Sequence, residues 1–177
     1  DIDLILGGCR DCLVQDNNIT HTTSPTGGAF AAMMIQKWPT TSGDYSGTDI
    51  SGNSIDCGPL RACGSGIYVG SHGWYPQTPF GRTDANPIRA KIHNNTVSNA
   101  KSGMYVAAHE FEIYSNQFSD AHGQHFPSSC GTLVSSGPIV VSPTSELIDF
   151  HDEDVDAATE HLFDERDWRN CIPNWPY

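Results

Sequence analysis

The sequence predicts an all-β solenoid, a coil of short strands in which each turn of the chain packs on the next. Two observations predict it. A phrase of the form apolar-x-x-Asn-x-apolar occurs four times, at residues 14–19, 50–55, 92–97 and 113–118. The last two copies stand 21 residues apart, whereas the earlier gaps are 36 and 42. A repeat this short buries its apolar side only by stacking on its neighbours, so each copy marks one rung.

A second recurring run supplies the rest of each rung. Gly66-Ile-Tyr-Val69 aligns with Gly103-Met-Tyr-Val106, and a weaker version begins at Ala32. Each is a β-prone run opened by a small residue, which is typical of a short strand. A rung should therefore run strand, Asn turn, strand, loop. A period of about 21 residues with two β runs leaves no room for the packed helix pair of an α-solenoid.

The asparagine of each phrase has a physical reason to recur. Asparagine tolerates left-handed backbone geometry, and its side-chain amide can bond the equivalent amide in the rungs above and below. Asn17, Asn53, Asn95 and Asn116 are therefore expected to form an internal ladder. Successive side chains in it would be about 4.8 Å apart, the spacing of neighbouring strands.

These phrases resemble the repeat of right-handed parallel β-helix proteins, the pectate-lyase-like superfold, with its Gly-Ile-x-Val and Ile-x-x-Asn-x-Ile pieces. The resemblance covers roughly residues 1–145 and implies a right-handed parallel β-helix of about four to six rungs. This superfold includes polysaccharide lyases, hydrolases, epimerases, phage tailspikes and non-catalytic adhesins. The resemblance therefore indicates the fold more sharply than the activity.

The two ends of the chain differ. Residues 146–177 are predicted to form a short acidic helical cap, because 10 of the 21 acidic residues lie between Glu146 and Asp167. Apolar residues follow there at helical spacing, namely Val155, Ala158, Leu162 and Phe163. Residues 1–6 instead read as a strand already inside a rung. An uncovered first rung exposes strand edges, so we expect further upstream rungs or a partner chain to cover it.

Composition limits the function. The net charge of -12 argues against nucleic acid and against an anionic membrane surface as partners. It also disfavours a strongly anionic polymer unless a local basic strip overrides the average. No apolar run is long enough to span a bilayer.

Cysteines and sequons indicate an extracellular protein. Six cysteines in 177 residues suggest an oxidising compartment. Cys57 is expected to pair with Cys63, and Cys130 with Cys171. The Cys9-x-x-Cys12 motif could be a small-loop disulfide or a redox pair. Asn18 and Asn94 each begin a glycosylation sequon, although both sequons overlap the repeat and could arise by chance.

Stacked rungs place equivalent residues in columns, and a column of His and Tyr side chains is the predicted catalytic site. Aligning the second strands brings His72 beside His109 and Tyr68 beside Tyr105. A His or Tyr in such a strip could move a proton while a basic neighbour holds a uronate carboxylate, as lyases and epimerases require. The alternative is a surface ladder of stacked polar side chains.

The predicted substrate-binding residues flank this column or lie in the aromatic loop of residues 71–90. They are Lys37, Trp38, Trp74, Tyr75, Arg82, Arg89 and Glu110. Loops on a rigid scaffold concentrate binding, and exposed aromatics suit stacking on a sugar ring. The same aromatics could instead close the loop on itself as a small satellite core.

No cofactor is expected. A Ca²⁺ site like that of pectate lyases would need a cluster of Asp residues, which the sequence does not provide. The His122-x-x-His125 motif near Asp120 could hold a metal only with a further ligand from another rung.

The sequence therefore favours a secreted carbohydrate-active protein that acts on an extracellular polysaccharide as a lyase, epimerase or hydrolase. A non-catalytic carbohydrate-binding or adhesive module, and a structural subunit that stacks on another chain, are the alternatives.

Overall fold

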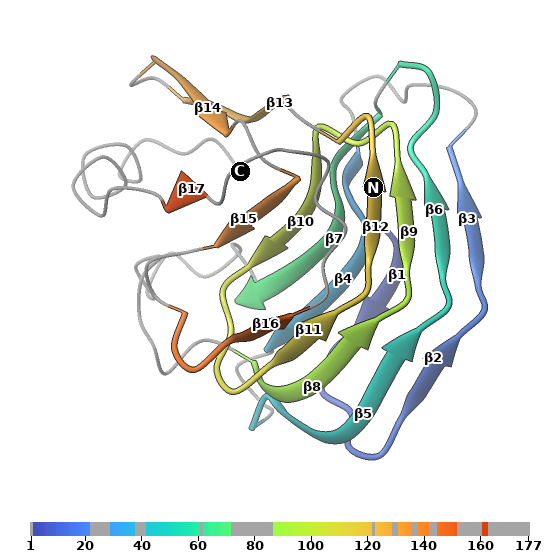
Figure 1. Cartoon of the computed structure of the whole chain (residues 1–177), viewed down its shortest axis with the longest axis vertical. Coiled ribbons are helices and arrows are strands. Elements are labelled where there is room, and N and C mark those ends of the chain that lie inside the picture. The colour runs from blue at the N-terminus through green and yellow to red at the C-terminus, as the bar shows by residue number, and fades with distance from the viewer. Residues whose placement is uncertain are drawn as a thin grey trace.

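A computed structural model describes residues 2–21, 29–37, 42–60, 62–71, 87–121, 123–128, 131–135, 138–141, 145–151 and 161–162. Within these ranges the chain forms strands and no helix, arranged as a parallel β-solenoid of about four rungs (Figure 1). Each rung takes one strand from each of three sheets, which we name sheets A, B and C. None of the described residues belongs to a helix that is long and apolar enough to cross a membrane.

In each sheet, the strands of successive rungs lie side by side. Sheet A contains β1 (Ile2–Leu6), β4 (Ala29–Lys37), β7 (Cys63–Ser71), β10 (Ser102–Val106), β15 (Ile139–Val141) and β17 (His161–Leu162). Sheet B contains β2 (Leu13–Gln15), β5 (Asp44–Ser51), β8 (Ile88–His93), β11 (Glu112–Tyr114) and β16 (Asp149–His151). Sheet C contains β3 (Asn18–Thr20), β6 (Ser54–Asp56), β9 (Thr96–Ser98) and β12 (Gln117–Ser119). A separate antiparallel hairpin joins β13 (Gly123–Ser128) to β14 (Gly131–Ser135).

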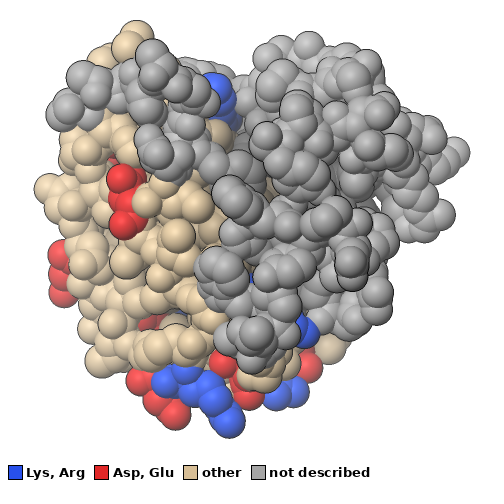
Figure 2. Space-filling view, turned by 180° about the vertical axis from the view of Figure 1, so that it is seen from behind, with Lys and Arg blue, Asp and Glu red and all other residues tan. Residues whose placement is uncertain are grey.

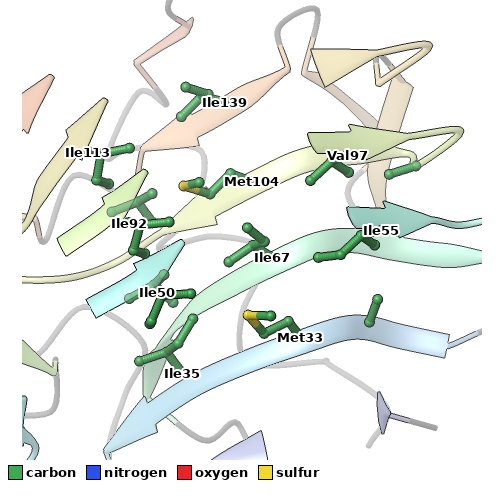
Figure 3. Packing of buried hydrophobic residues seen from close by; sticks show 14 of the residues in the cluster. Met33, Ile35, Ile50, Ile55, Ile67, Ile92, Val97, Met104, Ile113 and Ile139 are labelled. Carbon is green, nitrogen blue, oxygen red and sulfur yellow. The ribbon is translucent and has the colours of Figure 1, made fainter. Parts of the chain in front are cut away.

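The apolar residues of the repeat form buried columns that meet inside the coil (Figure 3). Sheet B contributes Ile50, Ile92 and Ile113, which lie in register across three rungs. Sheet A contributes Met33, Ile67, Met104 and Ile139 in the same way. Each such side chain contributes roughly 1.5–3 kcal/mol when fully buried, so the stacked columns supply the main stabilisation of the fold.

The glycine that opens two of the sheet A runs is required by close packing. A Cβ atom added to Gly66 would overlap the Val97 side chain, and one added to Gly103 would overlap the Phe118 ring. Sheet A therefore approaches sheet C too closely at this corner for any larger residue. The recurring Gly of the motif is thus explained by contact between sheets.

The predicted asparagine ladder is confirmed. The side-chain Nδ2 of Asn17 donates to Oδ1 of Asn53 over 2.8 Å, Asn53 donates to Asn95 over 2.8 Å, and Asn95 donates to Asn116 over 2.9 Å. The backbone N–H groups of Asn17, Asn53 and Asn95 donate to the same oxygens over 3.0–3.1 Å. Three of the four side chains, all but Asn17, are buried.

The prediction that these asparagines themselves adopt left-handed backbone geometry is wrong, however. The left-handed conformation belongs to the residue before each of them. Those residues are Asp16, Gly52, Asn94 and Ser115, with φ of 55°, 66°, 54° and 54°. The turn between sheets B and C is made one position earlier, which leaves the ladder asparagine free to point inward. Its recurrence therefore reflects side-chain bonding and not backbone tolerance.

None of the described residues of the expected acidic helix is helical, and two short strands lie in that range. Asp149, Phe150 and His151 form β16, in which Phe150 lies in register with Ile113 and extends the core column of sheet B. Leu162 belongs to β17 and pairs with Val141 in sheet A. The edges of sheets A and B offer backbone hydrogen-bond partners to a further strand. Phe150 faces the core between two polar neighbours, which is the alternation of a strand and not the spacing of a helix. Val155, Ala158 and Phe163 lie outside the described residues.

Two disulfides close short loops in the solenoid. Cys57 pairs with Cys63, as predicted, with their Cα atoms 5.4 Å apart. Cys9 and Cys12 also form a disulfide, with a Cα–Cα distance of 5.9 Å, in the first rung. Such bonds are typical of an oxidising, extracellular-type environment. Cys130 and Cys171 lie outside the described residues.

Candidate functional site

The outer face of sheet B carries a shallow groove with a volume of about 560 Å³. Because side chains alternate along a strand, the residues on either side of each buried isoleucine point outward. Asp49, Lys91, His93, Glu112 and Tyr114 reach the groove for this reason. Figure 2 shows Lys and Arg side chains mixed with Asp and Glu along the lower edge of the molecule, where Figure 1 places sheet B.

Charges across the groove alternate from rung to rung. The central strand β8 supplies Lys91 and His93, and the strands on either side supply carboxylates. Lys91 Nζ lies 2.8 Å from Glu112 Oε2 of the following rung, and His93 Nε2 lies 3.1 Å from the Asp49 carboxylate of the preceding one. At the corner before the strand, Arg89 Nε lies 2.6 Å from Glu110 Oε2. The register of β5, β8 and β11 produces this pattern.

The carboxylates of the groove are held ionised by their neighbours. The hydrogen bond from Lys91 lowers the pKa of Glu112 and outweighs the opposing effect of burial. Burial alone would raise the pKa of Asp49, but hydrogen bonds from Ser51 and His93 outweigh it and leave the pKa below its usual value. Ser51 Oγ donates to Asp49 Oδ1 over 2.6 Å. Neither carboxyl group is therefore a ready proton donor near neutral pH.

Three aromatic rings form a column beside these charges. His93 stacks on Tyr114 with ring centroids 4.6 Å apart and planes at 3°, and Tyr114 stacks on His151 at 4.7 Å and 9°. His151 Nε2 also lies 3.6 Å from Glu112 Oε1. The rings belong to successive strands of sheet B, so stacking of the rungs directly sets their spacing.

His93 is fixed through both ring nitrogens. The Asn94 amide lies 2.8 Å from Nδ1 and donates to it, so the ring proton resides on Nε2 and faces Asp49. The His93 side chain is 15% exposed and that of Asp49 is 29% exposed, so the pair stands at the surface without being fully solvated. A carboxylate that orients an imidazole in this way is a common arrangement for proton transfer. Exchange through Nδ1 would require Asn94 to move aside.

Of the predicted site residues that the structure describes, two reach this groove. Arg89 and Glu110 lie at its edge and are bonded to each other. His109 lies nearby in a bridge between Ile88 and Glu146, with its Nδ1 3.6 Å from Glu146 Oε2. Lys37 is half-buried at the end of β4 in sheet A. Trp38, His72, Trp74, Tyr75 and Arg82 lie outside the described residues.

The predicted pairing of Tyr68 with Tyr105 is confirmed, but the pair lies on sheet A and not at the groove. Their rings stack with centroids 4.9 Å apart and planes at 5°. Both side chains are 1% exposed. Burial, reinforced by the neighbouring Tyr105 ring, raises the pKa of Tyr68 well above its usual value, which keeps the phenol neutral. Their catalytic role stays a prediction.

Sequence reasoning missed Asp49, His93, Glu112 and Tyr114 as site residues. The signal for all four was present, because each is next to the first isoleucine of a repeat phrase. Comparing those flanking positions between rungs would have placed Lys91 between Asp49 and Glu112, and His93 beside Tyr114.

Glycosylation and metal binding stay untested. The predicted glycan acceptors Asn18 and Asn94 are both exposed. Among the described residues no group of three or more His, Cys, Asp and Glu could hold a metal ion. His122 and the side chain of His125 lie outside that part of the chain.

No protein-family model matches the chain, and comparisons with curated proteins and with solved structures found no match. Any function must therefore be argued from the groove itself.

Because carboxylates of the solenoid accept hydrogen bonds in the folded state, we expect the fold to be less stable in acid. Asp56 accepts hydrogen bonds from Asn99 and from the Gly58 amide, and these lower its pKa below 3.8. A group whose pKa is lower in the folded state stabilises the fold above its unfolded pKa, and this contribution disappears as the pH falls through the folded value. We expect the melting temperature to fall between about pH 5 and pH 2, and less steeply for Asp56→Asn. Equal slopes in thermal melts would contradict this assignment.

Proposed function

We propose that the protein is a secreted carbohydrate-active β-solenoid protein and that its polysaccharide lies along the groove of sheet B. One observation carries the proposal. The His93–Asp49 pair, Lys91, Glu112 and Tyr114 stand together on the open outer face of a rigid sheet. Such a surface offers charged donors and acceptors at fixed spacing, which is what recognition of a hydroxyl-rich polymer requires. The two disulfides support an extracellular setting.

Among carbohydrate reactions, the geometry favours proton abstraction over hydrolysis. Glycoside hydrolysis needs one carboxylic acid that is protonated, and it needs a second carboxylate. Asp49 and Glu112 both have lowered pKa values, so neither fills the acid role. The Asp49 carboxylate holds the His93 ring in place, and the cation of Lys91 beside it could hold a uronate carboxylate in place of Glu112. We therefore propose a lyase or epimerase reaction with His93 as the base and Asp49 as the residue that orients it.

The test is activity on a panel of uronate polymers, followed by the ultraviolet absorbance of the unsaturated product and, for epimerisation, by NMR. His93→Ala should reduce the rate by about 10²–10⁴-fold, the range usual for loss of a general base. His109→Ala is the matched control, because this histidine also contacts a carboxylate but lies outside the groove lining. If His109→Ala removes activity and His93→Ala does not, the groove is the wrong site.

A non-catalytic carbohydrate-binding module is the second candidate, and one observation favours it. Lys91, Arg89 and His93 are all bonded to carboxylates, and Asn94 covers the second nitrogen of His93. A groove whose charged groups are already paired with each other could bind glycan hydroxyls without catalysing a reaction. Calorimetric binding to a polymer of the panel, with no product after prolonged incubation, would establish this role. Loss of that binding in Lys91→Met would place it at the groove.

A further inference from the structure

Asn94 lies at the edge of the groove, at the corner between sheets B and C. It follows His93, the last residue of β8 and part of the groove lining. Asn94 is exposed, and its backbone is left-handed, with φ of 54°. Its amide nitrogen Nδ2 lies 2.8 Å from Nδ1 of His93. Any group attached to this nitrogen would therefore begin beside the His93 ring.

Asn94 is also the first residue of Asn94-Asn95-Thr96, the acceptor motif for N-linked glycosylation. Thr96 is exposed at the start of β9. Asn95 is instead buried, and its side chain bonds both neighbours of the asparagine ladder. Within this triplet, the motif thus selects the asparagine whose amide can carry a glycan without opening the core.

The neighbouring rungs leave room around Asn94. The equivalent corner residues are Gly52 in the preceding rung and Ser115 in the following one, since each stands one position before a ladder asparagine. Gly52 has no side chain, and a Cβ atom there would overlap Oδ1 of Asp16. Ser115 has a small one. A bulky group on Asn94 therefore meets no large side chain at the corner of either adjacent rung.

The second glycosylation motif, at Asn18, lies on a different surface. Asn18 is exposed in β3 of sheet C, and its Oδ1 accepts a hydrogen bond from the Thr20 hydroxyl over 3.4 Å. The groove lining does not include Asn18. A glycan at Asn18 would extend from sheet C, so this motif provides an internal control.

We propose that Asn94 is an N-glycosylation site and that its glycan limits access to the His93 side of the groove. The donor is a lipid-diphosphate-linked oligosaccharide. Nδ2 of Asn94 forms a bond to the anomeric carbon of this donor, the bond from that carbon to the diphosphate breaks, and Nδ2 releases one proton. The first sugar then lies beside His93 and close to Tyr114, which stacks on it. Only the expected effect on a polysaccharide substrate rests on the proposed function.

The test compares the full chain secreted from a eukaryotic host cell with its Thr96→Ala variant. This change removes the motif but keeps Asn94 and its contact with His93. Thr96→Ser keeps the motif and should restore the glycan. Peptide mass spectrometry should find a glycan on Asn94 in the wild type and in Thr96→Ser, and none in Thr96→Ala. An unmodified Asn94 in the wild-type chain would overturn the proposal.

Hydroxyl-radical footprinting then measures access to the groove without any substrate. Oxidation of His93 should be several-fold slower in the glycosylated wild type than in Thr96→Ala. His151 lies at the far end of the ring column and should react equally in both. Thr20→Ala, which removes the motif at Asn18, should leave the oxidation of His93 unchanged. Equal oxidation of His93 with and without the Asn94 glycan would overturn the proposal.

Activity on the uronate polymers separates this inference from the proposed function. If both hold, Thr96→Ala should act several-fold faster than the glycosylated wild type. Protection of His93 together with a lack of activity in both forms would reject the proposed function and support the glycan assignment. Equal, measurable rates in the two forms would overturn the role of the glycan at the groove.

Discussion

Replacing Asn95 by alanine should lower the free energy of unfolding by about 3 kcal/mol or more, the effect of leaving several buried polar groups unpaired. The Asn95 side chain donates to Oδ1 of Asn116 over 2.9 Å and to the Ile50 carbonyl over 3.0 Å. Its own Oδ1 accepts from the Nδ2 and backbone N–H of Asn53. Alanine removes all of these partners from a site that is 0% exposed. Urea denaturation of the purified variant would measure the loss.

Asn17→Ala is the matched control for this prediction. Asn17 makes the same bonds toward the following rung, but it is exposed and nothing among the described residues donates to its Oδ1. Water can replace its partners, so the loss should stay near 1 kcal/mol. Asn95→Asp keeps the shape but cannot donate to Asn116, so it should be at least as harmful as alanine. Equal losses at Asn17 and Asn95 would show that the buried ladder has no special role.

Substitution of Gly103 by alanine should destabilise the protein by about 2–3 kcal/mol, the upper part of the range for overpacking a close-packed interior. The new Cβ would overlap the Phe118 ring and stand 2.9 Å from the Pro138 carbonyl oxygen. Phe118 is part of the core, and the Pro138 carbonyl accepts the hydrogen bond of the Met104 amide over 2.9 Å. Neither neighbour can move without breaking a contact. Thermal and urea unfolding would both report the change.

Phe118→Leu should partly rescue Gly103→Ala, because the smaller side chain makes room for the added methyl group. In a double-mutant cycle the two changes should therefore couple favourably by about 1 kcal/mol. The single Phe118→Leu variant provides the reference for the loss of ring contacts. Strictly additive losses would mean that the cost at Gly103 comes from the backbone and not from contact between sheets A and C.

The solenoid and its ladder could be predicted because both depend on residues that recur in one short phrase. The inward positions of that phrase keep their identity from rung to rung, so a pattern in the sequence reports a column in space. The helical spacing in residues 146–177 did not predict the two described strands in that range, β16 and β17. A three-residue strand such as Asp149–His151 is too short for its alternation to compete with the helical spacing that surrounds it.

The groove could not be predicted in the same way. Its outward residues differ in type from rung to rung, and their contacts depend on register. Asp49 and His93 are 44 residues apart in the chain. The phrases at residues 50–55 and 92–97 align their two strands, but a repeat shows which positions recur and not which differing side chains meet. His109 forms bridges with Ile88 and with Glu146, whereas its predicted neighbour His72 lies outside the described residues, so the His72–His109 column stays a prediction.

The stack of His93, Tyr114 and His151 would limit how the groove could hold the proposed glycan. With a ring on each side at less than 5 Å, both faces of Tyr114 are already occupied. A pyranose cannot lie flat on it, so only the rim and the phenolic oxygen are accessible to a ligand. Recognition would then depend on where each hydroxyl points, axial or equatorial. We would expect the protein to separate epimers of one monosaccharide better than it separates chains of different lengths.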